Sequence, residues 1–268
     1  MQTIASVSFL NAKPLVDGLE DEPGLTLLSN VPARLLDTLV GRAAQVALCP
    51  VIDFQLAPCE LAIVPAGCIG SDGATLTVRV FSHSPLDDLH RVHVDGDSHT
   101  SVALLQVVFA ERYGRRLELT TLRLRGVTGS DEPHDALLLI GDKVVRDEPD
   151  PILYPFQLDL GEAWKKLTGL PFVFATWMAR AEAELGDLPA RLLRRRQANS
   201  RRIPEIVAAH ARSLGWPDDL ATRYLEENLR FELGPRELES IQLFWSKCHA
   251  LGLIEKLRPM RLYRSSQF

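Results

Sequence analysis

The chain lacks the short motifs that identify the commonest nucleotide-binding and hydrolytic enzymes. It contains no G-x-S-x-G elbow, no Walker A loop and no G-x-G-x-x-G fingerprint. Its seven histidines include no H-x-x-x-H pair, and its four cysteines include no C-x-x-C pair. These absences argue against common hydrolases, kinases and dehydrogenases, and the lack of paired ligand spacing argues against a zinc site.

Long apolar runs and an excess of positive charge are also absent. No apolar run reaches the roughly 18 residues that cross a bilayer, and the formal net charge is −5. An acidic chain has no general attraction for nucleic acid or for an anionic membrane, so we expect neither as a partner. The start, MQTIASVSFLNAKPL, has no basic segment followed by a long apolar stretch. We therefore expect a cytoplasmic protein with reduced thiols.

One basic segment, residues 191–202 (RLLRRRQANSRR), stands out against this acidic background. It holds six arginines but no aromatic residue on which a base could stack. We interpret it as the solvated face of a helix whose arginines pair with nearby glutamates.

Short apolar runs and amphipathic stretches alternate along the first part of the chain. The pattern predicts strands at 4–9, 25–28, 45–48 and 61–64, with helices that begin at Pro32 and Pro50. Such alternation favours a mostly parallel sheet covered by helices on both faces.

A second, similar cycle follows, and the rest of the chain is helical. The pattern predicts strands at 75–82, 91–95, 136–140 and 172–177, and helices at 98–113 and 161–168. From Ala179 onward we find helical spacing and no strand candidate. We predict that lobe 1 comprises 1–80 plus 178–268 and that lobe 2 is the inserted segment 81–177. The crossings would lie near Val80–His83 and Thr176–Met178, and a ligand cleft would lie between the lobes.

The segment Asp97-Ser98-His99-Thr100-Ser101 is the best local signal for a ligand site. It lies between a predicted strand and a long predicted helix, so its backbone N–H groups would be unpaired and the helix dipole would lie behind them. Ser98, Thr100 and Ser101 add hydroxyl donors. A carboxylate or phosphate suits such a turn, although plain helix capping by Ser98 is the alternative.

Three further polar residues follow predicted strands or turns. Asn11 comes after the first strand, where ligands bind in open α/β sheets, but asparagine is also common in turns. Thr77 could face the cleft or pack locally within its strand. Asp142 follows the strand at 136–140 and could bind a ligand hydroxyl or cap a helix. The residues alone leave these alternatives open.

Five segments in order along the chain carry a family resemblance: SFLNAKPL, GATLTVRVFS, DSHTSVALL, LLIGDKV and DLGEAWKKLTGLPFVFATW. Together they resemble the chorismate dehydratase family of the futalosine route to menaquinone. The resemblance implies a two-lobed α/β fold like that of type 2 periplasmic binding proteins, with a helical C-terminal segment packed on lobe 1. It also implies a hydro-lyase that removes water from chorismate to give 3-[(1-carboxyvinyl)oxy]benzoate without a cofactor.

The resemblance also implies roles for individual residues. Asn11 and Thr77 fall on catalytic positions, although the family commonly has serine where Thr77 stands. Ser98, His99, Thr100, Ser101 and Asp142 fall on the substrate-binding turns. The chain departs from the family pattern after Asp142, where Lys143-Val144-Val145 replaces the usual x-A-L.

Other functions remain as alternatives to the dehydratase. A non-catalytic binding protein would share the fold and the anion turn, but it would usually carry an export signal. The sister enzyme 1,4-dihydroxy-6-naphthoate synthase is expected to show S-P-C-P-N-D after the first strand, where this chain has S-F-L-N-A-K-P. A ligand-sensing domain of a transcription regulator would be preceded by a helix-turn-helix segment.

Overall fold

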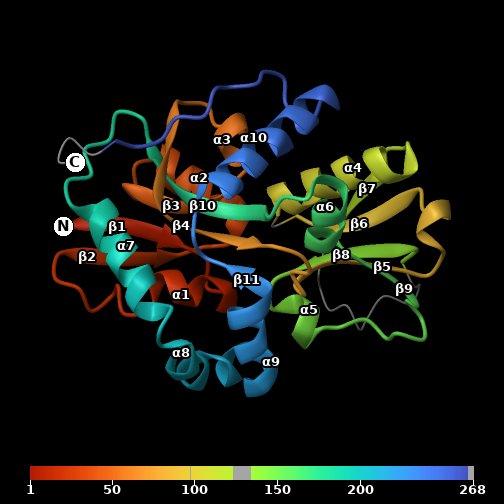
Figure 1. Ribbon diagram of the computed structural model, residues 1–268, viewed down its shortest axis with the longest axis horizontal. Coiled ribbons are helices and arrows are strands. Elements are labelled where there is room, and N and C mark those ends of the chain that lie inside the picture. The colour runs from red at the N-terminus through yellow and green to blue at the C-terminus, as the bar shows by residue number, and fades with distance from the viewer. Residues whose placement is uncertain (97, 123–133, 265–268) are drawn as a thin grey trace.

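The strands of the protein form two separate sheets. The computed structural model describes residues 1–96, 98–122 and 134–264, and Figure 1 shows the two sheets side by side. The described strands of the first sheet have the order β11 (Leu229–Arg230), β4 (Leu61–Ser71), β10 (Phe172–Arg180), β3 (Val46–Pro50), β1 (Gln2–Ser6) and β2 (Leu25–Ser29). Those of the second have the order β7 (Glu118–Leu122), β6 (Arg91–Asp95), β8 (Ala136–Ile140), β5 (Val78–Ser82) and β9 (Phe156–Asp159).

Each sheet is mixed, with a parallel half and an antiparallel half. In the first sheet β1 pairs in parallel with β2 and β3, whereas β10 runs antiparallel to β3 and β4. In the second sheet β6 pairs in parallel with β7 and β8, whereas β5 runs antiparallel to β8 and β9. The continuous apolar runs of β3 and β8 are buried at every position, as strands covered on both faces are.

The helices cover the faces and ends of these sheets. Those of the N-terminal half are η1 (Leu10–Ala12), α1 (Lys13–Val16), α2 (Pro32–Val40), α3 (Asp53–Leu56), η2 (Leu86–Asp88), α4 (His99–Tyr113) and α5 (Lys143–Arg146). Those that follow are α6 (Leu160–Thr168), α7 (Leu188–Asn199), α8 (Ile203–His210), η3 (Arg212–Leu214), α9 (Asp218–Arg223), the π-helical turn η4 (Tyr224–Asn228) and α10 (Pro235–Ala250). None in the described ranges is long and apolar enough to cross a membrane.

The C-terminal helices pack on the first sheet, which confirms that part of the predicted fold. α7 packs against β4 and α1, and α10 packs against β10. α8, α9 and η4 contribute to a second apolar cluster that includes Leu10, Trp216 and Tyr224. Most of the arginine-rich segment lies in α7, in which Arg191 and Arg195 both pair with Glu22, as the sequence predicts. Their side chains are only 16% and 21% exposed, so this face of the helix is less solvated than expected.

Several predicted element boundaries are wrong. Pro50 ends β3 and does not open a helix, because α3 begins only at Asp53. The strand predicted from Thr75 begins at Val78. Three short strands at or near sheet edges, β7, β9 and β11, have no counterpart in the prediction, and β11 lies in the segment expected to be wholly helical.

The chain changes sheets at places that differ from those predicted. It leaves the first sheet after Ser71 and enters the second at Val78, and it returns between Asp159 and Phe172. The predicted crossings near Val80–His83 and Thr176–Met178 overlap the paired strands β5 and β10, so those positions are wrong. We keep the division into a first lobe and an inserted second lobe as a proposal, with the boundaries moved to these crossings.

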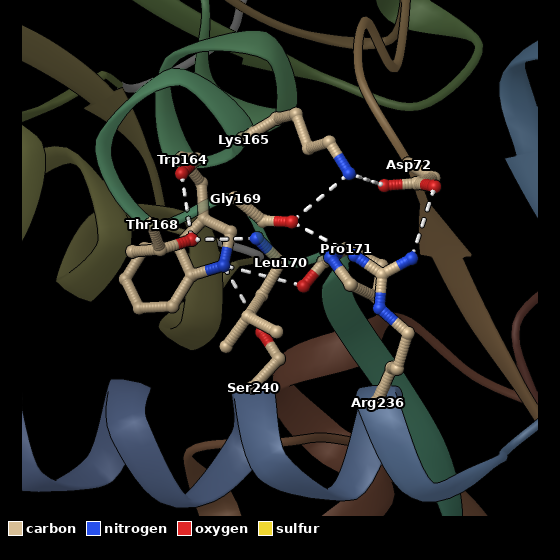
Figure 2. A network of polar contacts seen from close by, with 9 residues as sticks. All are labelled: Asp72, Trp164, Lys165, Thr168, Gly169, Leu170, Pro171, Arg236 and Ser240. Carbon is tan, nitrogen blue, oxygen red and sulfur yellow. Dashed lines mark hydrogen bonds and ion pairs between the residues drawn. The ribbon is translucent and has the colours of Figure 1, made fainter.

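The two crossings are joined to each other and to α10 by a polar network (Figure 2). Asp72, from the first crossing, accepts a hydrogen bond of 2.5 Å from Lys165 and lies 3.9 Å from a guanidinium nitrogen of Arg236. Lys165 and Arg236 also donate to the carbonyl of Gly169. Both connecting segments are therefore held to the helix that packs on the first sheet.

A tryptophan at the centre of this network anchors the second crossing. The indole Nε1 of Trp164 donates to the carbonyl of Pro171 and to Oγ of Ser240, at 3.2 and 3.0 Å (Figure 2). Thr168 donates to the carbonyl of Trp164 and accepts from the N–H of Leu170. These bonds shape the T-G-L-P turn that leads from α6 into β10.

Candidate active site

A pocket opens between the two sheets. It encloses about 590 Å³ of empty space, including open solvent at its mouth. Its apolar walls include Val7, Phe9, Leu48, Ile69, Val78, Ile140, Phe174 and Leu229. Its polar lining consists of Asn11, Thr75, Thr77, Ser98, Thr100, Ser101 and Tyr224.

Asn11 reaches this pocket from the turn after β1. Its neighbours Leu10 and Ala12 are fully buried, which fixes η1 on the protein core. The Oδ1 atom of Asn11 is buried and has no hydrogen-bond partner among the described residues. An unpaired buried carbonyl oxygen is costly, so this atom is a strong candidate for a ligand contact.

The N-terminus of α4 also lines the pocket. Ser98 caps the helix by accepting from the N–H of Ser101 at 3.3 Å, so the capping alternative is correct for its side chain. Thr100 accepts from the N–H of Ile52 at 3.2 Å, which leaves its hydroxyl hydrogen available as a donor. Ser98, Thr100 and Ser101 still line the pocket at a helix N-terminus, where an anion is favoured. Asp97, the first residue of the predicted turn, lies outside the described residues.

His99 belongs to the same turn but is not part of the pocket lining. Its Nδ1 lies 2.7 Å from Oδ1 of Asp53, which is fully buried at the start of α3. The hydrogen bond that His99 makes to Asp53 raises the pKa of His99, and burial raises the pKa of Asp53. The contact joins a helix of the first lobe to the helix that carries the predicted anion-binding turn.

Asp142 also connects the two lobes and is not part of the pocket lining. Its carboxylate accepts from the backbone N–H of Leu10 at 3.2 and 3.3 Å and from Nε1 of Trp216 at 2.9 Å. Burial raises its pKa, although these two donors oppose the rise. The preceding Gly141 has a φ of +61°, and a Cβ there would lie 2.9 Å from the Phe9 ring. The Gly-Asp pair therefore holds the turn that carries Asn11.

Thr77 enters the pocket beside a tyrosine that the sequence did not single out. Its Oγ1 lies 2.7 Å from the hydroxyl of Tyr224, which is fully buried at the start of η4. The Tyr224 ring stacks on Trp216, with centroids 4.7 Å apart and planes 16° apart. Only helical spacing marks residues 218–229 in the sequence, so no local signal pointed to Tyr224.

The described residues that line the pocket carry no ionised side chain. Among them there is no Asp, Glu, His, Lys or Arg. Tyr224 is their one ionisable residue; burial raises its pKa, and the hydrogen bond with Thr77 opposes the rise only in part. The described lining can therefore offer fixed neutral donors and acceptors to a ligand, but no side chain that titrates near neutral pH.

Known proteins resemble this chain along most of its length. Residues 2–250 match a protein family described by the words menaquinone biosynthesis. A chorismate dehydratase from Thermus thermophilus is 30% identical in an alignment that covers 91% of this chain and 93% of that protein.

Solved structures with low sequence identity share the fold. A crystal structure of a protein from Archaeoglobus fulgidus superposes with a TM-score of 0.74 at 16% identity and covers 94% of this chain and 98% of that one. A Candida albicans protein described as having the generic periplasmic binding protein fold gives a TM-score of 0.66 at 10% identity, with 100% and 99% coverage. These likenesses confirm the predicted two-lobed, type 2 periplasmic-binding-protein-like fold.

Proposed function

The chain belongs to the menaquinone biosynthesis family, and from this membership we propose that it is a chorismate dehydratase. The reaction removes water from chorismate and gives 3-[(1-carboxyvinyl)oxy]benzoate. The observation that carries this proposal is a pocket between the lobes that is lined both by the neutral turn Ser98–Ser101 and by Asn11 and Thr77. The likeness to the Thermus thermophilus enzyme supports it.

Two carboxylates make chorismate a suitable ligand for this pocket. The N-terminus of α4, with Ser98, Thr100 and Ser101, would bind one carboxylate through N–H and hydroxyl donors. The apolar walls, including Phe9 and Phe174, suit a ring that becomes aromatic. We assign substrate binding to these three hydroxyl residues.

The absence of a side-chain base in the described lining points to a base supplied by the substrate. We infer that the enolpyruvyl carboxylate takes the proton from the ring carbon that carries the ether. The carbanion left behind is conjugated to the ring carboxylate, and fixed donors there stabilise the developing charge. The C–O bond to the neighbouring hydroxyl then breaks, and that hydroxyl leaves as water with the proton that the carboxylate took.

The other four predicted site residues have two kinds of role in this proposal: two contact the substrate, and two hold the turns around the pocket in place. Asn11 and Thr77 would contact the reacting part of the substrate and so remain the catalytic candidates. His99 and Asp142 would act through the turns that they hold, because neither lines the pocket. A pocket of fixed neutral dipoles accelerates a reaction by orienting the substrate and by electrostatic stabilisation.

We further propose that the enzyme works in the cytoplasm, in the futalosine route to menaquinone, on free chorismate and without a cofactor. Four free cysteines, three of them buried, support a reducing compartment.

The direct test is to incubate the purified, folded protein with chorismate and to identify the product by mass spectrometry and NMR. We expect the aromatic enolpyruvyl ether together with one equivalent of water. Binding of chorismate without any product would contradict the proposal and favour a binding protein, which the fold alone also permits.

A further inference from the structure

Tyr224 is a fully buried polar residue of the pocket lining that the proposed mechanism leaves without a role. Its hydroxyl lies 2.7 Å from Oγ1 of Thr77, one of the two catalytic candidates. The contact is short and buried, so it constrains where the Thr77 hydroxyl can point.

The tyrosine is held in place on its other side. Its ring stacks on Trp216 at a centroid distance of 4.7 Å, and Trp216 donates from Nε1 to Asp142 at 2.9 Å. Asp142 in turn accepts from the N–H of Leu10, the residue before Asn11. Tyr224 also begins η4, and π-helical turns occur frequently at functional sites. Packing and hydrogen bonds thus fix the ring relative to Asn11.

The hydrogen bond with Tyr224 sets the direction of the Thr77 hydroxyl. Either oxygen of the pair can be the donor. If the phenol donates, the hydroxyl hydrogen of Thr77 is free to point into the pocket; if Thr77 donates, its oxygen keeps a lone pair that can accept there. In both cases Thr77 has one further polar contact to offer in the pocket that it lines.

We propose that Tyr224 is a positioning residue that fixes the orientation of the Thr77 hydroxyl toward the substrate. The inference rests on the proposed dehydratase function, which gives Thr77 a contact with the reacting part of the substrate. A hydroxyl held in one orientation stabilises charge that develops on the substrate more effectively than one that must reorient.

The test is the steady-state kinetics of Tyr224→Phe with chorismate. Phenylalanine keeps the stack on Trp216 but removes the hydrogen bond with Thr77, so the fold should persist while the Thr77 hydroxyl becomes free to reorient. We expect kcat to fall by about 10- to 100-fold with a smaller change in KM, because the lost alignment matters most in the transition state. The matched control is Tyr154→Phe, a buried tyrosine outside the pocket lining, which should stay within about twofold of wild type.

A double-mutant cycle separates positioning from general damage. If Tyr224 acts through Thr77, the double variant with Thr77→Val should be little worse than Thr77→Val alone. Tyr224→Phe activity within twofold of wild type, or fully multiplicative losses in the cycle, would overturn the proposal.

A measurement without substrate keeps this inference separate from the proposed function. The side-chain methyl group of Thr77 should give an NMR signal that shifts in Tyr224→Phe and does not shift in Tyr154→Phe. A wild-type protein that makes no product but shows this shift would contradict the dehydratase and leave the positioning intact. An unchanged signal would overturn the positioning itself.

Discussion

Oδ1 of Asp53 lies 2.7 Å from Nδ1 of His99, and this contact joins α3 of the first lobe to α4 of the second. Next to it, the N–H of Ile52 donates to Oγ1 of Thr100. The predicted anion-binding turn is thus fixed to the first lobe by two adjacent hydrogen bonds. Asp142 makes another connection between the lobes, because its carboxylate accepts from the N–H of Leu10. The pocket depends on these contacts for its shape.

His99→Asn should remove a pH-dependent part of the stability. The pKa of His99 is raised by the Asp53 hydrogen bond, so its stabilisation is fully present below the unfolded pKa, about 6.5, and is lost as pH rises through the folded value. The raised pKa of Asp53 makes the stability depend on pH in the same direction, because the folded state also binds that proton more tightly than the unfolded chain.

The measurement is urea unfolding of wild type and His99→Asn between pH 5 and 8. Since the His99 side chain is 39% exposed, solvent screening limits the difference to about 1 kcal/mol at pH 5.5, and it should shrink by pH 8. The control is His90→Asn, an exposed histidine elsewhere on the second lobe. A difference that grows with pH would contradict this assignment.

Asn11→Ala should abolish most of the activity while the fold persists. The buried Oδ1 atom of Asn11 has no partner among the described residues, so its removal leaves no protein group newly unpaired on that side. We expect kcat to fall by about 100- to 1,000-fold, which is typical of losing one preorganised polar contact to a transition state. Product formation from chorismate, with circular dichroism as the check on folding, tests this. Full activity would remove Asn11 from the site.

The main features of the fold were predictable because they depend on local pattern. The buried run Ala136–Ile140, the proline that opens α2 and the long helix after Ser98 all appear where the sequence places them. Five of the seven predicted site residues, among them Asn11 and Thr77, line one pocket, because the carboxyl ends of strands and the starts of helices gather at one edge of α/β sheets.

The features that were missed depend on long-range contacts. Thr75 and Leu76 look like the start of a strand, but their N–H groups bond to Asp159, more than 80 residues away. Tyr224 sits in an ordinary helical pattern and gains its place only through Thr77 and Trp216. The periodicity of a single sequence cannot identify contacts between residues that are so far apart along the chain.

Asp142→Asn should weaken both stability and activity. Oδ1 accepts from the N–H of Leu10 and from Nε1 of Trp216, and Oδ2 lies 3.3 Å from the same Leu10 nitrogen. An amide would remove the negative charge that both donors face and would place an NH₂ group against the Leu10 N–H. We expect a loss of about 1–3 kcal/mol in unfolding free energy and a lower kcat, because the turn that carries Asn11 loosens. Asp147→Asn, on a partly exposed carboxylate that pairs with Arg146, serves as the control and should change stability by less than about 0.5 kcal/mol. Equal effects of the two substitutions would show that the Leu10 contact is unimportant.

Asp159→Ala tests how strongly the two crossings are joined. Its carboxylate accepts from the N–H groups of Thr75 and Leu76 in one crossing and from those of Gly161 and Glu162 in the other. Alanine would remove a helix cap and leave further part-buried donors unpaired, so we expect a loss of about 3 kcal/mol in unfolding free energy.

The crossings are packed as well as bonded at this point, so the loss should not be relieved by a small shift of the chain. A Cβ on Gly161 would lie 2.5 Å from Oγ of Ser71 and 2.7 Å from the carbonyl of Gly73. Asp150→Ala is the matched control, because that exposed carboxylate accepts from Ile152 in a local turn. Urea unfolding should separate the two variants by at least about 2 kcal/mol. If Asp159→Ala is no less stable than Asp150→Ala, the four bonds do not hold the crossings together.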